Sequence, residues 1–131
     1  SLISLLKLLV EYILEMNDLK SLSIGILLFM LGQVFTFYQL NGQFIWKWIE
    51  KNPLLVSLLG IPISLVFIYA TKYTVIAFDY VMWPQRFIGF ASGIFIYAWG
   101  TYYYFNQPID VKTALSLCLA VVLIGIQVLW K

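Results

Sequence analysis

The side chains of this chain that can do chemistry are few, and they interrupt long apolar stretches. Gln33 lies in the first such stretch, beside a helical face formed by Gly32, Thr36, Gln39 and Gln43 at spacings of four, three and four. An amide or a hydroxyl away from water costs free energy unless it is paired. This face is therefore expected to turn toward other helices or a cavity, where it makes interhelical hydrogen bonds or binds a substrate.

A second set of hydroxyl groups recurs every seven residues, at Ser57, Ser64 and Thr71, with Gly60 and Pro62 nearby. Proline lacks the N–H that a helix needs, so Pro62 is expected to interrupt the hydrogen-bond ladder. One interpretation is that the hydroxyls bond to backbone carbonyls within a kinked helix. The other is a hinge, in which Ser64 lines a transport site.

Three charged residues fall at the edges of apolar stretches: Lys72, Asp79 and Arg86. Arg86 follows Pro84 by two residues, and its long side chain can reach the polar surface of a membrane. Asp79 is expected to pair with Arg86 or Lys72. Alternatively, Arg86 lies at the mouth of a site and binds a phosphate or carboxylate.

Several classes of function are excluded by the residues that the chain lacks. It has no histidine and one cysteine, Cys118. Pairs of inward carboxylates and the motifs GxSxG and HExxH are also absent, so we expect neither an enzyme nor a metal or other cofactor. The net charge of +2 comes without a basic cluster, which argues against nucleic acid as a partner.

The composition indicates that membrane-spanning helices hold these residues. Of 131 residues, 63% are hydrophobic and only 11% are charged, too few charges to cover a water-soluble domain. Four apolar runs, at 22–44, 54–78, 84–105 and 111–130, each reach the length of about 20 residues that a membrane-spanning helix needs. We therefore predict an all-α integral membrane protein whose domain 19–131 is an antiparallel bundle of four transmembrane helices.

Residues 1–18 precede these runs and form a segment of their own. Ser4, Lys7, Glu11 and Glu15 follow one another at spacings of three, four and four, which makes a polar stripe on a leucine-rich helix. The stripe predicts an amphipathic helix lying in the membrane interface. The alternative is a shorter membrane helix whose stripe faces another subunit.

Further local predictions concern the connections between the apolar runs and the glycines of the third run. Asp110 is placed to cap the fourth helix, Trp83-Pro84 marks the start of the third, and the middle turn is expected within 73–83. Gly89, Gly93 and Gly100 form a small-residue face on which another helix can pack closely. The many aromatic residues around this face form either an interfacial belt or the walls of a ligand site.

Two segments of the chain resemble the small multidrug resistance transporters of the drug/metabolite transporter superfamily, over roughly residues 22–130. Residues 91–94 (ASGI) are similar to the packing segment of that family's third helix, and residues 104–110 (YFNQPID) to the turn before its last helix. The resemblance implies a four-helix transporter. The family exchanges protons for a cation at a Glu of its first helix, and the similar position here is Gln33, which cannot titrate. When the turn is aligned, Arg86 and Gly89 occupy the positions of the family's substrate-side Tyr and Trp.

These observations together predict a small transporter-like protein. Gln33, Thr36 and Ser64 would line its cavity, with Arg86 at the mouth, for a small metabolite or a lipid-linked head group. Four helices are too few to enclose such a path, so we expect a homodimer or a larger membrane complex. The alternative is an accessory subunit that packs Gly89 and Gly93 against a larger complex. We expect the membrane to be a bacterial or archaeal inner membrane. Five of the eight Lys and Arg residues fall on the side of the termini, which predicts that the termini are cytoplasmic.

Overall fold

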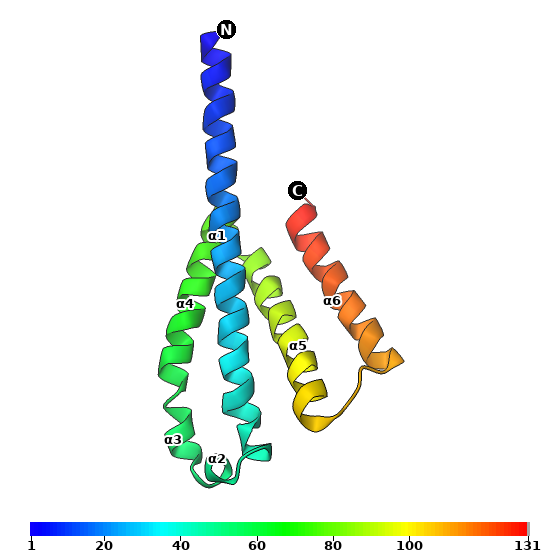
Figure 1. The fold of residues 1–131 in the computed structure, drawn as a ribbon. Coiled ribbons are helices and arrows are strands. Elements are labelled where there is room, and N and C mark those ends of the chain that lie inside the picture. Colours follow the sequence, from blue (N-terminus) through cyan, green and yellow to red (C-terminus); the bar gives the residue numbers. More distant parts are fainter. Residues whose placement is uncertain (131) are drawn as a thin grey trace.

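The computed structural model describes residues 1–130, and all regular structure in this range is helical, as the sequence predicts. Three short helices connect the first two long ones: η1 (Gly42–Phe44), α2 (Lys47–Lys51) and α3 (Pro53–Ser57). The long helices, which run alternately down and up in Figure 1, are α1 (Leu2–Asn41), α4 (Gly60–Ala77), α5 (Trp83–Phe105) and α6 (Val111–Leu129).

Helix α1 is one continuous element of 40 residues, about 60 Å long at 1.5 Å per residue. The division expected at residue 18 falls inside this helix, because no glycine or proline lies there to end it. Residues 2–16 extend beyond the other helices and are exposed all round (Figure 1). The interfacial position of this part stays a prediction.

The second predicted run is divided between α3 and α4, with the break at Leu58 and Leu59. Pro62 has no N–H to donate to the carbonyl oxygen of Leu58. That oxygen instead accepts a hydrogen bond from the N–H of Ile61, at 3.2 Å. The expected interruption of the ladder is thus a tightened turn just ahead of the proline.

Residues in the left-handed conformation form both turns that flank α5. Asp79 and Tyr80, with φ of 53° and 66°, turn the chain between α4 and α5, inside the predicted range 73–83. Asn106, with φ of 52°, ends α5, and asparagine is among the residues that tolerate this conformation best.

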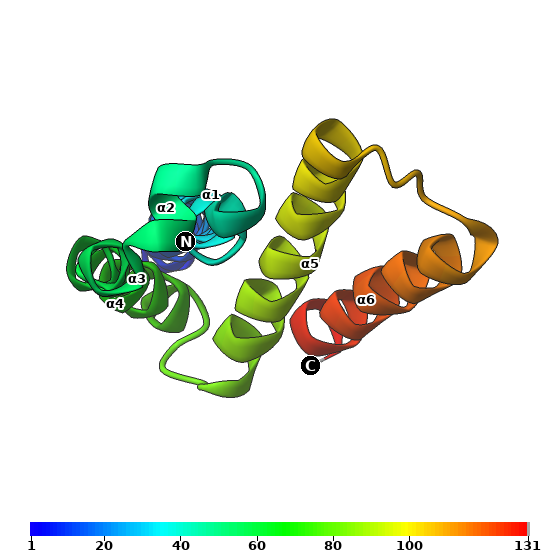
Figure 2. The same ribbon diagram turned by 90° about the horizontal axis from the view of Figure 1, so that it is seen from below.

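Helix α1 packs between α4 and α5, as the view from below shows (Figure 2). Phe29, Ala70 and Ile88, one from each of the three helices, meet in the buried core. Gly25 lets α1 approach the backbone of α4, because a Cβ there would lie 3.0 Å from the nitrogen of the fully buried Thr74. These three helices form the compact part of the fold.

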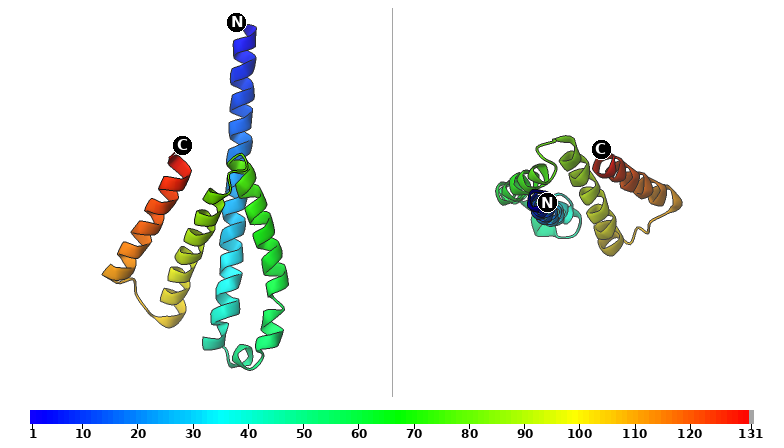
Figure 3. Two further views of the ribbon diagram at one scale, coloured as in Figure 1. Left: turned by 180° about the vertical axis from the view of Figure 1, so that it is seen from behind. Right: turned by 90° about the horizontal axis from the view of Figure 1, so that it is seen from above.

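Helix α6 stands apart from this group. It packs mainly against α5, and Ala120 is its one buried residue. The two helices are close at the C-terminal end of α6 and diverge toward its N-terminal end (Figure 3). The expected antiparallel bundle is therefore a packed group of three helices with a fourth splayed from it.

Three segments are long and apolar enough to cross a membrane: Leu2–Phe44, Pro53–Ala77 and Val111–Leu129. Helix α5 has 23 residues, about 35 Å, which exceeds the hydrocarbon thickness of about 30 Å. Its tyrosines, its tryptophans and Arg86 lower its mean hydropathy, and it is not one of these three. The fourth span stays a prediction.

Candidate functional site: a cavity between α1, α5 and α6

The glycine face of α5 packs against α1 of the same chain. A Cβ added to any of the three glycines would lie within 3.1 Å of a side chain of α1, and the pairs are Gly89 with Phe29, Gly93 with Gln33, and Gly100 with Phe37. The partners on α1 recur every fourth residue, so they form one face. The surface that the accessory-subunit hypothesis assigned to a larger complex is therefore already covered.

Gln33 joins the two helices through its side-chain amide. Its Nε2 donates a hydrogen bond to the backbone carbonyl oxygen of Gly89, at 3.2 Å. Its carboxamide atoms lie 3.0–3.1 Å from the position that a Cβ at Gly93 would take. The close approach that the glycines permit therefore places this half-buried amide between the helices.

A cavity of about 610 Å³ opens where α6 diverges from α1 and α5, within the range of about 300–1,000 Å³ usual for small-molecule sites. Its walls also include the connection between α5 and α6. Besides the phenol of Tyr97, the polar side chains that line it are Gln33, Thr36, Asn41, Thr101, Gln107 and Thr113.

Two of the four predicted substrate residues line this cavity, namely Gln33 and Thr36. Ser64 is exposed on the outside of α4, because the preceding residue, Ile63, takes the buried position and successive residues of a helix point about 100° apart. Arg86 is also exposed, one turn before Phe90, the first residue of α5 on the cavity wall. Neither is part of the cavity.

Two threonine hydroxyls on the cavity wall lack hydrogen-bond partners. The Oγ1 atoms of Thr36 and Thr101 are both buried and unpaired. Other helical hydroxyls of the chain donate to the carbonyl four residues earlier, such as Thr74 to Ala70 and Ser92 to Ile88, each at 2.8 Å. A buried hydroxyl without a partner is unfavourable, so these two groups are available to a ligand.

Thr101 was not predicted, and neither were Gln107 and Thr113. Thr101 is the one threonine of the third apolar run. Its residue type is therefore unusual there, but the sequence does not show which way its side chain faces. Gln107 and Thr113 lie in and after a turn that the sequence marks as a boundary. Only the divergence of α6 brings these residues to the same cavity as Gln33.

The cavity lining is electrically neutral, with no Asp, Glu, Lys or Arg among its residues. The nearest carboxylate along the chain, Asp110, is not among the lining residues, and it accepts a hydrogen bond from the backbone N–H of the lining residue Thr113 at 2.8 Å. Within residues 1–130, no three His, Cys, Asp or Glu residues are grouped to hold a metal ion.

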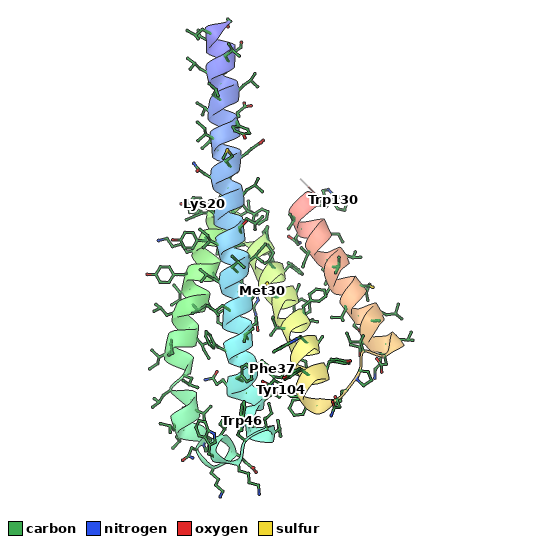
Figure 4. All side chains as sticks on the ribbon, viewed as in Figure 1. Lys20, Met30, Phe37, Trp46, Tyr104 and Trp130 are labelled. Carbon is green, nitrogen blue, oxygen red and sulfur yellow. The ribbon has the colours of Figure 1, made fainter. Side chains whose placement is uncertain are left out.

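Aromatic rings pack together beside the cavity, where α1 meets α5. Phe37 is 4% exposed, and its ring centroid lies 5.8 Å from that of Tyr97 and 6.2 Å from that of Tyr104. The hydroxyls of Tyr38 and Tyr104 are hydrogen-bonded at 2.6 Å. Figure 4 shows Phe37 and Tyr104 meeting between α1 and α5. These contacts make a firm wall, and Phe37 and Tyr97 face the cavity.

The predicted cap of α6 by Asp110 is confirmed. Because the cap is a carboxylate, it predicts that the stability of the protein depends on pH. The hydrogen bonds from Thr113 lower the pKa of the Asp110 carboxyl below its ordinary value. A lowered pKa stabilises the folded state above the unfolded-state pKa of about 3.9, and this contribution disappears as the pH falls through the folded pKa. We expect acidification from pH 7 to pH 3 to lower the thermal unfolding temperature partly through this cap.

The measurement is a pH series of thermal unfolding in a mild detergent. Asp110→Asn keeps a capping oxygen but does not titrate. It should therefore show a smaller loss of stability between pH 5 and pH 3 than the unchanged protein. Identical pH profiles for the two proteins would contradict a stabilising role for the Asp110 charge.

Comparison of the chain with protein-family models, with curated proteins and with solved structures finds no match. Function is therefore inferred from the cavity and from the chemistry of its walls.

Proposed function

We propose that the chain is an integral membrane protein, similar to the drug/metabolite transporters, that binds a small molecule or a lipid-linked head group in the cavity between α1, α5 and α6. The observation that carries this proposal is the pair of buried, unpaired hydroxyls of Thr36 and Thr101 on the wall of that cavity. Natural proteins pair nearly all their buried polar groups. Two exceptions on the same cavity wall are best explained by a ligand that pairs them.

Transport in this proposal does not use proton exchange at a carboxylate. Gln33 lies on α1 at the position similar to that family's Glu, and its amide is already bonded to the backbone of α5. No carboxylate lines the cavity, so no residue there takes up and releases a proton near neutral pH. Binding and release then depend on the movement of α6, the helix with the fewest buried residues among the long ones.

We further propose that the working form is a homodimer. Helix α6 exposes five apolar residues at alternating spacings of four and three, Leu115, Leu119, Val122, Ile126 and Leu129. This repeat is typical of helices that pack against each other at a crossing angle of about 20°. This face is turned away from the cavity, because Thr113 and Leu117 line the cavity from the opposite side of α6.

An accessory role in a larger complex is the second candidate, and the exposed first half of α1 favours it. Apolar side chains such as Leu2, Leu9 and Ile13 are more than half exposed there. Because Gly89 and Gly93 are covered by α1, a partner subunit would bind this half of α1 or α6 instead.

One experiment separates the two candidates. The protein is purified in mild detergent, its mass is determined, and its thermal unfolding is followed with a panel of neutral, anionic and cationic metabolites. A binding protein should be a dimer, and a ligand at 100 times its Kd should stabilise it by about 2.7 kcal/mol. A monomer that copurifies with another subunit and responds to no compound would overturn the proposal.

A further inference from the structure

We infer that the ligand of this cavity is an uncharged ring bearing several hydroxyl groups, such as a sugar or a cyclic polyol. The inference rests on the proposed binding function and specifies the class of ligand. Such a ring can come from a free solute or from the head group of a lipid, and the chemistry of recognition is the same for both.

None of the residues that line the cavity carries a charge, and Arg86 lies outside it on an exposed surface. Bringing an ion into an apolar site without a counter-charge is strongly unfavourable. A cation would require a carboxylate here and an anion would require an Arg or Lys, so the lining selects neutral ligands.

The polar side chains of the lining are amides and hydroxyls, and each of these groups both donates and accepts. A ligand hydroxyl does the same, so several hydroxyls on one ring match several such groups. The unpaired Oγ1 atoms of Thr36 and Thr101 are the first partners to expect. Both atoms are buried in the ligand-free protein. Threonine in a helix adopts two side-chain rotamers, and a rotation of about 120° about χ1 from one to the other would bring each hydroxyl to a ligand.

Phe37, Phe90 and Tyr97 line the cavity, and an aromatic face packs well against the C–H face of a ring. Leu40 and Leu117 line it as well, and they offer an apolar path between α1 and α6 for a lipid tail. A polyhydroxylated ring presents polar edges and apolar faces, and this lining complements both.

The test uses probes that share one tail and differ in the head group. The protein is placed in nanodiscs of neutral lipid, and saturable binding of radiolabelled decyl β-D-glucoside, decyl phosphate and decyltrimethylammonium is measured for each probe against empty nanodiscs. We expect unlabelled decyl glucoside to compete at a concentration at least about tenfold lower than decyl phosphate or decyltrimethylammonium, because each of these brings an uncompensated charge. Displacement by free glucose or myo-inositol would identify a free solute as the source, and its absence would identify a lipid head group.

Variants assign the binding to the cavity. The double variant Thr36→Val/Thr101→Val should weaken glucoside binding about tenfold. Its thermal stability should stay level or rise, because the hydroxyls that it removes have no partner in the ligand-free protein. Thr71→Val makes the same change at a half-buried position of α4 outside the cavity, and it should leave binding unchanged.

Two results would overturn the inference in different ways. If a labelled charged probe binds saturably and the glucoside does not, the ligand class is wrong while the binding site stands. If none of the three labelled probes binds, both the inference and the proposed binding function fail.

Discussion

Replacing Gly100 with leucine is expected to separate α1 from α5 and to destabilise the protein by about 3 kcal/mol or more, at the upper end of the range for overpacking. A Cβ at this position would lie 2.7 Å from Cε1 of the Phe37 ring. That ring is buried and in contact with Tyr97 and Tyr104, so the only space open to it is the cavity that it lines. The α1–α5 contact should therefore open, and the cavity beside it should be distorted.

The measurement is unfolding of the purified protein in mixed detergent micelles, with Gly125→Leu as the matched control. Gly125 also lies within a helix, but a Cβ there would meet nothing within 4 Å. The control should be neutral or slightly stabilising, because leucine has a higher helix propensity than glycine. Equal losses from both substitutions would show that leucine acts through the helix itself and not through the Phe37 contact.

A compensating variant isolates the contact further. Phe37→Ala by itself removes a large buried ring, and we expect a loss of about 2 kcal/mol. This is below the 3–5 kcal/mol typical of water-soluble cores, because lipid is as apolar as the protein interior. Combined with Gly100→Leu, it creates space for the leucine, so the double variant should be more stable than the sum of the two losses predicts. Strictly additive losses would contradict direct packing of Gly100 on Phe37.

Gln33→Leu is expected to reduce ligand binding or uptake at least tenfold while lowering stability only slightly. The substitution removes the hydrogen bond from Nε2 to the carbonyl oxygen of Gly89. Hydrogen bonds between membrane helices contribute on average only about 0.6 kcal/mol. The same amide lines the cavity, so a ligand loses a donor and an acceptor there. Binding should therefore fall much further than stability does.

Gln39→Leu provides the matched control. Gln39 is on the same helix and also donates through Nε2 to a backbone carbonyl, that of Val56, at 3.3 Å. It does not line the cavity between α1, α5 and α6. Binding and thermal unfolding are measured in parallel for both variants, which should lose similar stability. Unchanged uptake by the Gln33 variant in reconstituted vesicles would remove this residue from any role in transport, and parallel losses in both variants would indicate a purely structural effect.

Local pattern alone was enough to predict several elements correctly. The start of α5 at Trp83-Pro84 and the Asp110 cap of α6 are both observed. They are properties of a few neighbouring residues: proline suits the first turn of a helix, and aspartate pairs with the free N–H groups there. The apolar composition likewise predicts helices long enough for a membrane, because spacing and hydrophobicity do not depend on which helices meet.

The sequence could not predict which surfaces meet, because partners in space come from distant parts of the chain. The glycines of α5 indicate a close approach, yet only the structure shows that Phe29, Gln33 and Phe37 occupy that face. Similarly, Ser64 belongs to a regular seven-residue spacing of hydroxyls but is exposed on the outer surface of α4, because Ile63 is the residue buried against the core. The splay of α6 brings Thr101 to the same cavity as Gln33 and Thr36. Packing of whole helices determines that arrangement, and no local pattern encodes it.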